Sequence, residues 1–371
     1  MPTRHQVLHA WTRQMRTLLP AVHATRAATL ALFAAGILWS GTVTLLKVGA
    51  ALPLTATDPS IERRLRRFLS NAHVTASSLW SPLLPPLLAG LGQRELLFVF
   101  DPTPYRDGAT LLCLGVVCRG RVLPVAWRVM PQQTAWPQRL EPLLAAMLVT
   151  VAAALPPGST ATLLADRGLV GPALLDAAAR VGWPVVLRLR ASAGEATRVR
   201  CGDGPEQRLA ELPTGPGQRW DTPAAIFKEA GWRQGYLTIR WDATAQEPWV
   251  LFSARPGGTD RVREYRRRVQ AEATYQDAKG RGFALERSKV MAVDRIDRLL
   301  LALHLALWWA FGLGLQTIRN GWRRRFDRRD RRDLSVMRLG VTACRDALQR
   351  DHPPALPFRH TPDGWIYPWL R

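Results

Sequence analysis

Residues 94–101 read Arg-Glu-Leu-Leu-Phe-Val-Phe-Asp, a run of five apolar residues that opens on a charged pair and closes on an aspartate. Two more short apolar stretches, 110–118 and 122–130, follow directly, and turn residues bound each of them. Short apolar runs between turn residues are typical of buried strands. The sequence therefore predicts three adjacent strands at the start of the central part of the chain.

After these strands the pattern alternates between helix and strand. Residues 138–154 and 169–181 have helical composition, whereas residues 161–166 and 184–190 are short apolar stretches typical of strands. Three strands, then a helix, a strand, a helix and a strand form the order of the RNase H-like fold. We therefore expect the α/β class, with an RNase H-like mixed sheet that has helices on both faces.

The composition changes on both sides of this core. Helical, Arg-rich sequence precedes it, a stretch rich in Gly, Pro and Thr interrupts it, and arginine dominates its C-terminal end. We expect a helical DNA-binding region at 1–90, the first part of the core at 91–190, a β-rich insertion at 191–256, the second part of the core with the catalytic and C-terminal helices at 257–320, and a basic C-terminal tail at 321–371.

The excess of arginine predicts an acidic partner. The chain has 51 Lys and Arg against 29 Asp and Glu, which leaves a formal net charge of +22. Charge of this size indicates binding to nucleic acid or to an anionic membrane surface, and we favour nucleic acid. The four cysteines form no CxxC pair, which fits a reducing cytoplasm better than a disulfide framework.

Two apolar runs allow a different interpretation, a membrane protein with two spans. Residues 27–46 carry no charge over 20 residues, but the stretch 40–42 interrupts the run, and Ser40 is the expected N-cap of a second helix. Residues 299–315 are interrupted by His304 and flanked by Arg-rich sequence. We therefore expect two helices in the first run, a buried core helix in the second, no membrane contact and no cleavable signal peptide.

Asp101 and Asp166 each close a predicted strand. Side chains at the carboxyl ends of strands leave the sheet edge and can converge outside it, where open α/β sheets build their sites. Taken alone, an aspartate after a strand is commonly a turn former or a helix N-cap. A third group is therefore needed before the two carboxylates indicate a site.

That third group lies in the helix predicted from about residue 260. Tyr265, Arg268, Glu272 and Lys279 stand at offsets 0, 3, 7 and 14. At about 100° per residue these side chains fall within an arc of about 60° on one helix face. A surface helix with ion pairs would give a similar pattern, but lysine occurs only four times in the chain and one of the four is on this arc.

Three carboxylates without a histidine cluster suit hard cations, so we expect Mg²⁺, with Mn²⁺ able to substitute. Two such ions about 4 Å apart can activate a water on one side of a phosphate and stabilise the leaving oxygen on the other. The reaction that this set of residues predicts is phosphodiester cleavage.

These residues resemble the motifs of the bacterial DDE transposases of the IS-four family. The family signature Y-x2-R-x3-E-x6-K is matched without a gap by residues 265–279. Asp101-Pro-Thr resembles the first motif, D-x-T, and Asp166-Arg-Gly after an apolar strand resembles the second. The resemblance covers roughly residues 90–315 and includes a β-rich insertion before the glutamate. Pro102 and Pro104 depart from the pattern, since they stiffen a turn that we expect to be polar.

The resemblance implies a role for each motif residue. The implied metal ligands are Asp101, Asp166 and Glu272. Arg268 and Lys279 would hold backbone phosphates, the arginine through a forked contact and the lysine as a point charge. Tyr265 would donate a hydrogen bond to a phosphate near the scissile end.

Family members that pass through hairpin intermediates stack a tryptophan of the insertion on a flipped base, and Trp249 resembles that residue. An aromatic ring suits this task because it stacks on any base. Trp232 and Trp241 compete for the role, and packing of Trp249 into the insertion's own core is the alternative.

The function that the resemblance implies is that of a transposase. It would bind the inverted ends of its own mobile element as a homodimer, hydrolyse one strand at each end with Mg²⁺, and join the freed 3′ hydroxyls to target DNA in the bacterial cytoplasm, in association with the nucleoid. Two alternatives remain open: an RNase H-like nuclease that cuts without joining, and a catalytically inactive DNA-binding derivative.

Overall fold

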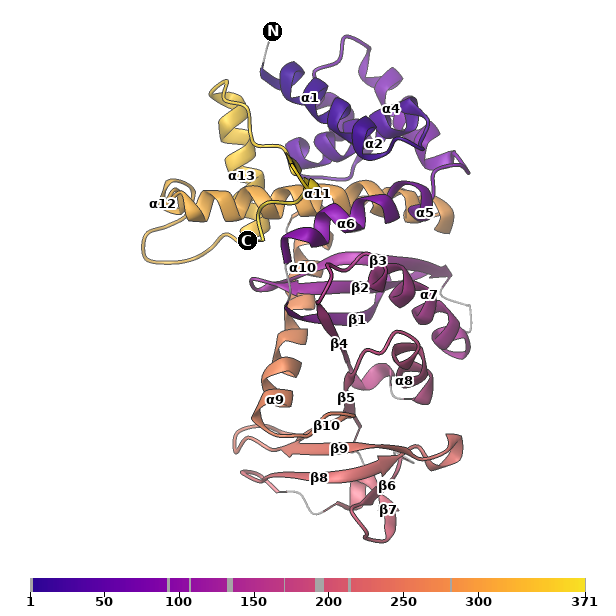
Figure 1. Cartoon of the computed structure of the whole chain (residues 1–371). Helices are drawn as coiled ribbons and strands as arrows, with labels where there is room; N and C mark the ends of the chain where they lie inside the picture. The colour runs from indigo at the N-terminus through magenta and orange to yellow at the C-terminus, as the bar shows by residue number, and fades with distance from the viewer. Residues whose placement is uncertain are drawn as a thin grey trace.

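The computed structural model describes residues 3–91, 94–106, 108–131, 136–169, 171–190, 197–212, 215–280 and 282–370. These residues form a mixed α/β structure built on one large sheet. Figure 1 shows helices from both ends of the chain gathered above the sheet, whose strands continue down to the foot of the molecule. The expected α/β class is confirmed at this level.

The described strands of the core are β1 (Glu95–Tyr105), β2 (Ala109–Cys118), β3 (Arg121–Pro131), β4 (Thr160–Ala165) and β5 (Val185–Leu189). β1, β2 and β3 are antiparallel neighbours, while β4 and β5 run parallel to β1 on its other side. The loop between β2 and β3 is Arg119 and Gly120, with φ of 44° and 83°. Positive φ at both residues gives the hairpin turn that matches strand twist. Each predicted core strand forms, and all except β1 lie within one residue of their expected bounds.

β1 does not end at Asp101 as predicted. Its parallel pairing with β4 ends at Phe100, opposite Ala165, but its antiparallel pairing with β2 continues to the end of the strand. Pro102 and Pro104 therefore lie within a strand and not in the expected turn. β1 no longer pairs with β4 at this point, so this side of the strand is an edge. Strand edges tolerate residues without an N–H group.

The described strands of the insertion are β6 (Arg198–Cys201), β7 (Glu206–Arg208), β8 (Arg219–Ile226), β9 (Arg233–Arg240) and β10 (Trp249–Ser253). β10 pairs antiparallel with β5, so the insertion continues the core sheet. The full strand order is β3-β2-β1-β4-β5-β10-β9-β8-β6-β7. The start of β10 is therefore next to the core strands and not in a remote lobe.

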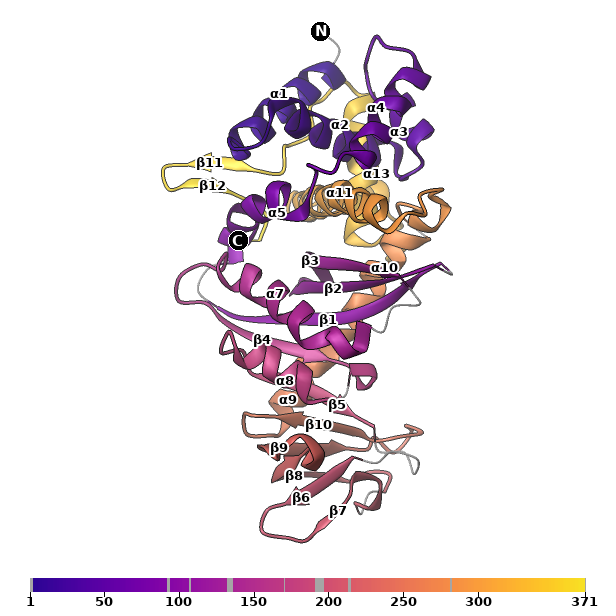
Figure 2. The same cartoon turned by 90° about the vertical axis from the view of Figure 1, so that its right-hand side faces the viewer.

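Helices cover both faces of the core strands. Figures 1 and 2 show α7 (Leu140–Ala152) and α8 (Pro172–Ala179) on one face, and α9 (Thr259–Arg266) and α10 (Gln270–Lys279) on the other. α7 and α8 supply the connections from β3 to β4 and from β4 to β5. α9 and α10 follow the insertion and return the chain to β1.

α11 (Val293–Arg319) is the central helix of the layer above the sheet. The other helices of this layer are α1 (Thr3–Leu18), α2 (Ala24–Ser40), α3 (Leu45–Ala50), α4 (Asp58–Ser70), α5 (Ala76–Leu79), α6 (Leu84–Leu88), α12 (Arg323–Phe326) and α13 (Val336–Gln349). Within the described residues, one helix, α11, is long and apolar enough to cross a membrane, and 94% of its most apolar window is buried. The expected core helix at 299–315 is confirmed. Because α2 and α4 pack on α11, removal of the N-terminal helices would expose its apolar surface.

The apolar run 27–46 breaks where the sequence predicted. α2 ends at Ser40, and Gly41 follows with φ of 63°, the left-handed conformation that closes a helix. Ser40 is not the N-cap of α3, because that position belongs to Thr44. The Ser40 hydroxyl instead donates to the Gly36 carbonyl oxygen at 2.6 Å, one turn back in α2. The N-cap prediction was therefore wrong.

The C-terminal segment is folded and is not the expected tail. α13 packs across α11 where two glycines meet. A Cβ atom on Gly340 would lie 1.8 Å from the Ala310 carbonyl oxygen, and one on Gly314 would lie 2.0 Å from that of Val336. A hairpin of β11 (Arg359–Thr361) and β12 (Gly364–Ile366) follows α13. Residues 321–370 thus belong to the helical layer.

The helical layer also covers the edge strand β3. The indole N–H of Trp308 in α11 donates to the Pro124 carbonyl oxygen at 2.8 Å, and that of Trp80 donates to the Val125 carbonyl oxygen at 2.7 Å. The register between β2 and β3 shifts at this point, as in a β-bulge. An uncovered edge strand would offer these carbonyl groups to other chains, so the two tryptophans fix the layer on the sheet and close its edge.

His304 is a buried histidine in the middle of α11, 3% exposed. Its ring packs edge-on against Trp127, with 4.4 Å between the centroids, and its Nδ1 has no hydrogen-bond partner among the described residues. Burial lowers the pKa of His304 to about 3. The folded state therefore holds the imidazole neutral.

We predict that His304 makes the protein sensitive to acid. Below about pH 6.5 the unfolded chain binds a proton at this ring and the folded chain does not, so stability falls by about 1.4 kcal/mol per pH unit, or about 2 kcal/mol at pH 5. His304→Leu should remove this part of the pH dependence. The measurement is the urea unfolding free energy at neutral pH and near pH 5.

Leu307→Ala is the matched control, because Leu307 and His304 line one cavity and a leucine does not titrate. It should lower the unfolding free energy equally at both pH values. A pH dependence in His304→Leu equal to that of the wild type would contradict a neutral, buried imidazole.

Candidate active site

Strand register brings Asp101 and Asp166 together. The last parallel pair between β1 and β4 is Phe100 with Ala165, and each aspartate is the next residue. Parallel strands share one carboxyl edge, so both side chains reach the same edge of the sheet. The structure places the two aspartates side by side although β1 continues past Asp101.

The segment 265–279 is not the single α-helix that the spacing assumed. α9 ends at Arg266, a 3-10 turn spans Arg267–Val269, and α10 begins at Gln270. A 3-10 turn winds more tightly than an α-helix, so three residues of it rotate the following side chains by about 60°. Arg268 lies in this turn. The predicted single arc is therefore wrong in detail, yet the contacts below show that the residues still reach the sheet edge.

The Arg268 guanidinium lies between the three predicted metal ligands. Its Nη2 is 2.9 Å from Asp101 Oδ1 and 3.1 Å from Asp166 Oδ2, and its Nη1 is 3.2 Å from Glu272 Oε1. The Arg268 side chain is 16% exposed, whereas that of Glu272 is 56% exposed. One cation thus holds all three carboxylates, with Glu272 on the solvent side.

The two aspartates have opposite pKa shifts. Burial raises the pKa of Asp101, and Arg268 opposes this only in part. Burial acts on Asp166 in the same direction, but Arg268, the Arg167 N–H and the Tyr265 hydroxyl together lower the pKa of Asp166. Burial also disfavours the charge on Arg268, yet Asp101 and Asp166 raise its pKa. The Arg268 guanidinium therefore stays charged between two carboxyl groups whose pKa values are shifted in opposite directions.

Tyr265 lies against Asp166 and links it to the insertion. Its hydroxyl donates to Asp166 Oδ1 at 2.9 Å. Burial, and then the charge of Asp166, raise the pKa of Tyr265, so the phenol keeps its proton. Trp249, the first residue of β10, packs edge-on against the Tyr265 ring with 5.2 Å between the centroids.

The other two tryptophans that compete for base stacking contact the insertion itself. Trp232 lies beside the Arg200 guanidinium, 5.0 Å from the ring centroid. The Trp241 indole N–H donates to the Ala245 carbonyl oxygen at 2.9 Å. Of the three tryptophans, Trp249 is the one that packs on a candidate site residue, Tyr265, in the described part of the chain.

Lys279 is beside the triad and outside it. Its Nζ donates to Thr103 Oγ1 at 2.8 Å and to the Pro104 carbonyl oxygen at 2.7 Å. Burial lowers the pKa of Lys279, opposed by the charges of Glu286 and Asp101. Thr103, the threonine of the first motif, therefore holds Lys279 at a point on β1 that is two residues beyond Asp101.

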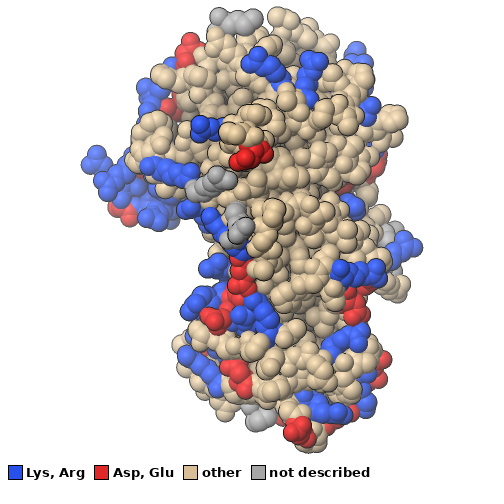
Figure 3. Space-filling model, in the orientation of Figure 1, with Lys and Arg blue, Asp and Glu red and all other residues tan. Residues whose placement is uncertain are grey.

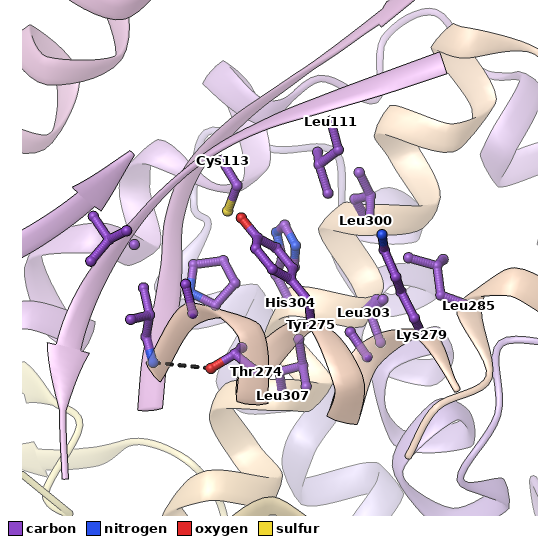
Figure 4. A pocket seen from close by; sticks show the side chains of 16 residues that line it. Leu111, Cys113, Thr274, Tyr275, Lys279, Leu285, Leu300, Leu303, His304 and Leu307 are labelled. Carbon is purple, nitrogen blue, oxygen red and sulfur yellow. Dashed lines mark hydrogen bonds between the residues drawn. The ribbon is translucent and has the colours of Figure 1, made fainter. Parts of the chain in front are cut away.

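Sequence reasoning missed Tyr275, whose hydroxyl donates to the Asp101 carbonyl oxygen at 3.2 Å. Figure 4 shows its ring reaching from α10 into a cavity, with the hydroxyl pointing toward Cys113. Burial raises the pKa of Tyr275 well above its usual range and that of Cys113 to about 12, so both groups are neutral. Tyr275 is three residues after Glu272 and four before Lys279, and this helical spacing was the signal that could have identified it.

Two further side chains dock α10 on the sheet. The Val122 N–H donates to Thr274 Oγ1 at 3.0 Å, the dashed line in Figure 4. The Arg121 guanidinium is 3.0 Å from Asp277 Oδ2. α10 is thus held on β1 and β3 at once, and this fixes where Glu272 and Lys279 stand.

Arg188 is a second residue that the sequence reasoning passed over. It is the one charged residue in β5, and its charge contributes to the lowered pKa of Asp166. Its Nη2 is 2.6 Å from Glu247 Oε1, and Arg167 Nη1 is also 2.6 Å from that oxygen. An arginine between the apolar residues Leu187 and Leu189 of a predicted strand was the available signal.

The triad has the donor type of a hard-cation site, but it holds a guanidinium. Carboxylate oxygens of Asp101, Asp166 and Glu272 all contact the Arg268 guanidinium, and such oxygens are the ligands that Mg²⁺ prefers. Within the described residues, no three His, Cys, Asp or Glu side chains are close enough together to hold a metal ion. A metal ion bound by all three carboxylates would have to take the place of the Arg268 guanidinium.

No protein-family model and no curated protein matches the chain. Among solved structures, it is similar to the piggyBac transposase in the cryo-EM structure of its synaptic complex with hairpin DNA. The two chains share 9% identity, the match covers 92% of this chain and 79% of that chain, and the TM-score is 0.42. A likeness at this level decides neither fold nor chemistry.

We predict that Arg268 stabilises the metal-free protein. Arg268→Ala leaves three carboxylates facing one another, so the unfolding free energy should fall by about 3 kcal/mol in the presence of a chelator. Arg268→Lys should recover only part of this loss, because an ammonium lacks the fork that reaches Asp101 and Glu272 together. Urea unfolding measures both effects.

Arg263→Ala is the matched control on the neighbouring helix, since Arg263 makes an exposed ion pair with Asp260. It should cost less than about 1 kcal/mol. Equal losses for Arg263→Ala and Arg268→Ala would show that the central guanidinium does not hold the site together.

Proposed function

We propose that this protein is a DNA transposase of the DDE type, which hydrolyses phosphodiester bonds at the ends of a mobile element and transfers the freed strands into target DNA. One observation carries the proposal. Asp101, Asp166 and Glu272 come from distant parts of the chain and meet around a single, largely buried cation at one edge of the sheet.

Strand order and motif spacing support the finer assignment. The order β3-β2-β1-β4-β5, with three antiparallel strands followed by two parallel ones, is the arrangement expected of an RNase H-like core. The ungapped Y-x2-R-x3-E-x6-K spacing at 265–279 supports the IS-four family.

The triad would bind Mg²⁺, two ions being expected with Mn²⁺ as a substitute, and these ions would activate a water and stabilise the leaving oxygen. The chain's own residues set the ligand positions. Tyr265 donates to one oxygen of Asp166, and Tyr275 fixes the backbone of Asp101. The two hydrogen-bonded aspartates, Asp101 buried and Asp166 half-buried, are thus oriented before any substrate arrives.

The cations of the site suit DNA phosphates. In the proposed complex, Arg268 and Lys279 bind backbone phosphates and Tyr265 binds a phosphate near the scissile end. Trp249, beside Tyr265, is available for a flipped base. The N-terminal helices read the end sequence, and two protomers hold two ends.

We predict that Asp101→Asn, Asp166→Asn and Glu272→Gln each lower metal-dependent cleavage by at least about a hundredfold, because each removes a ligand of the catalytic ions. Binding to an element-end duplex should stay within about threefold, since no phosphate-binding cation is lost. Cleavage and strand-transfer products are measured on labelled ends, and binding by gel shift.

Asp260→Asn is the matched control, a carboxylate on α9 that contacts Arg263 and none of the triad residues. It should cleave at the wild-type rate. Wild-type cleavage by Glu272→Gln would contradict the triad. Cleavage without strand-transfer products in the wild type would favour a nuclease, and binding without cleavage would favour an inactive derivative.

We also predict that binding to element ends weakens steeply with salt. Each phosphate that a Lys or Arg side chain neutralises releases a bound counterion, so affinity should fall by more than about tenfold between about 50 and 200 mM salt. Fluorescence anisotropy of a labelled duplex gives the slope. A weaker dependence would mean that the +22 charge is mostly engaged within the protein.

A further inference from the structure

Residues 323–333, here called the arginine loop, are the most basic part of the helical layer. They hold seven arginines and three aspartates, a net charge of 7 − 3 = +4. Figure 3 shows basic side chains gathered on the projecting part of the molecule around α12 and a second group lower on the same side, over α9 and α10. The outline is hollowed between the two groups.

A buried carboxylate gives the arginine loop a fixed shape. The Asp327 side chain is 2% exposed and accepts hydrogen bonds from the backbone N–H groups of residues 328, 333 and 334. The Arg323 guanidinium also donates to it, through Nε at 3.1 Å and Nη2 at 2.8 Å. Burying a carboxylate costs free energy unless hydrogen bonds offset it. A run of charged residues whose only role is solubility needs no buried, hydrogen-bonded carboxylate to fix its shape.

The end of the loop is attached to the helix that carries Glu272 and Lys279. Ser335, the N-cap of α13, donates from its hydroxyl to Asp277 Oδ1 at 2.8 Å. Asp277 is on α10, two residues before Lys279, and also binds Arg121 of β3. Ser335, two residues after the arginine loop, therefore positions the loop relative to the candidate active site.

The outward arginines are the ones available to a partner. Arg323 pairs with Asp327 and Arg325 with Asp346, so both act within the protein. The side chains of Arg328 and Arg331 are 71% and 74% exposed and share Asp333. Within the described residues, no carboxylate lies within 4.0 Å of the exposed cations of Arg324, Arg329 and Arg332.

We propose that the arginine loop binds the phosphate backbone of the DNA duplex whose scissile strand lies in the active site. This inference rests on the proposed function. A duplex is a rounded, regularly charged polymer, so it can contact the loop and the cations of α9 and α10 on either side of the hollow. A flat anionic membrane would meet the projecting loop alone.

The test uses the full chain with a fluorescein-labelled duplex of random sequence. The triple variant Arg324→Ala/Arg329→Ala/Arg332→Ala removes three outward cations and no buried contact. It should bind at least about tenfold more weakly near 100 mM salt, and the slope of log affinity against log salt should become shallower by about two to three.

The control variant Arg94→Ala/Arg139→Ala/Arg359→Ala removes the same charge from exposed arginines before β1, before α7 and in β11. It should lose less than about threefold in affinity and keep the wild-type slope. Asp327→Ala separates shape from charge, because it makes the protein more basic but removes the centre of the loop. It should bind more weakly than the wild type, with Asp327→Asn as a milder second variant.

Equal losses in the triple and control variants, or tighter binding by both Asp327 variants, would overturn the proposal. If the wild type fails to bind DNA, the proposed function is contradicted. If the wild type binds and the triple variant matches it in affinity and slope, only the arginine loop is contradicted. Loop-dependent binding to anionic phospholipid vesicles, with none to DNA, would assign the loop to a membrane instead.

Discussion

The Arg268 guanidinium is the interaction on which the candidate site depends. It contacts Asp101, 167 residues away in the chain, and also Asp166 and Glu272. Three carboxylates at one sheet edge would repel one another, most strongly at the partly buried aspartates, and a forked, always charged side chain offsets that repulsion. The metal-free site is thus arranged around a cation of the protein's own, and any metal ion bound there competes with it.

The position of α10 is the second constraint, and neutral groups set most of it. Tyr275 binds the backbone of Asp101, and Thr274 binds the backbone of β3. Because these partners are main-chain groups of two strands, α10 is registered to the sheet by hydrogen bonds that do not titrate near neutral pH. Asp277 of α10 in turn accepts a hydrogen bond from Ser335, which fixes the start of α13 relative to α10.

The two ends of the chain complete the structure that the sheet begins. α11 is apolar on nearly all sides, so it requires partners on all sides, and α2, α4 and α13 supply them. Trp308 and Trp80 then satisfy carbonyl groups on the edge strand β3. Helices remote in sequence therefore stabilise one edge of the same sheet whose other edge continues into the insertion, and the N-terminal helices are part of this cover.

The sequence by itself determined the core strands, the break at Gly41, the buried α11 and the residues that meet at the site, because apolar periodicity and motif spacing are local properties. Only the tertiary structure decided that β1 runs through Asp101, that a 3-10 turn carries Arg268, that Tyr275 holds Asp101, and that the expected tail folds. Each of these depends on a partner far along the chain, such as β2 for β1 or α11 for α13, and no local pattern records which distant surface will be present to pack against.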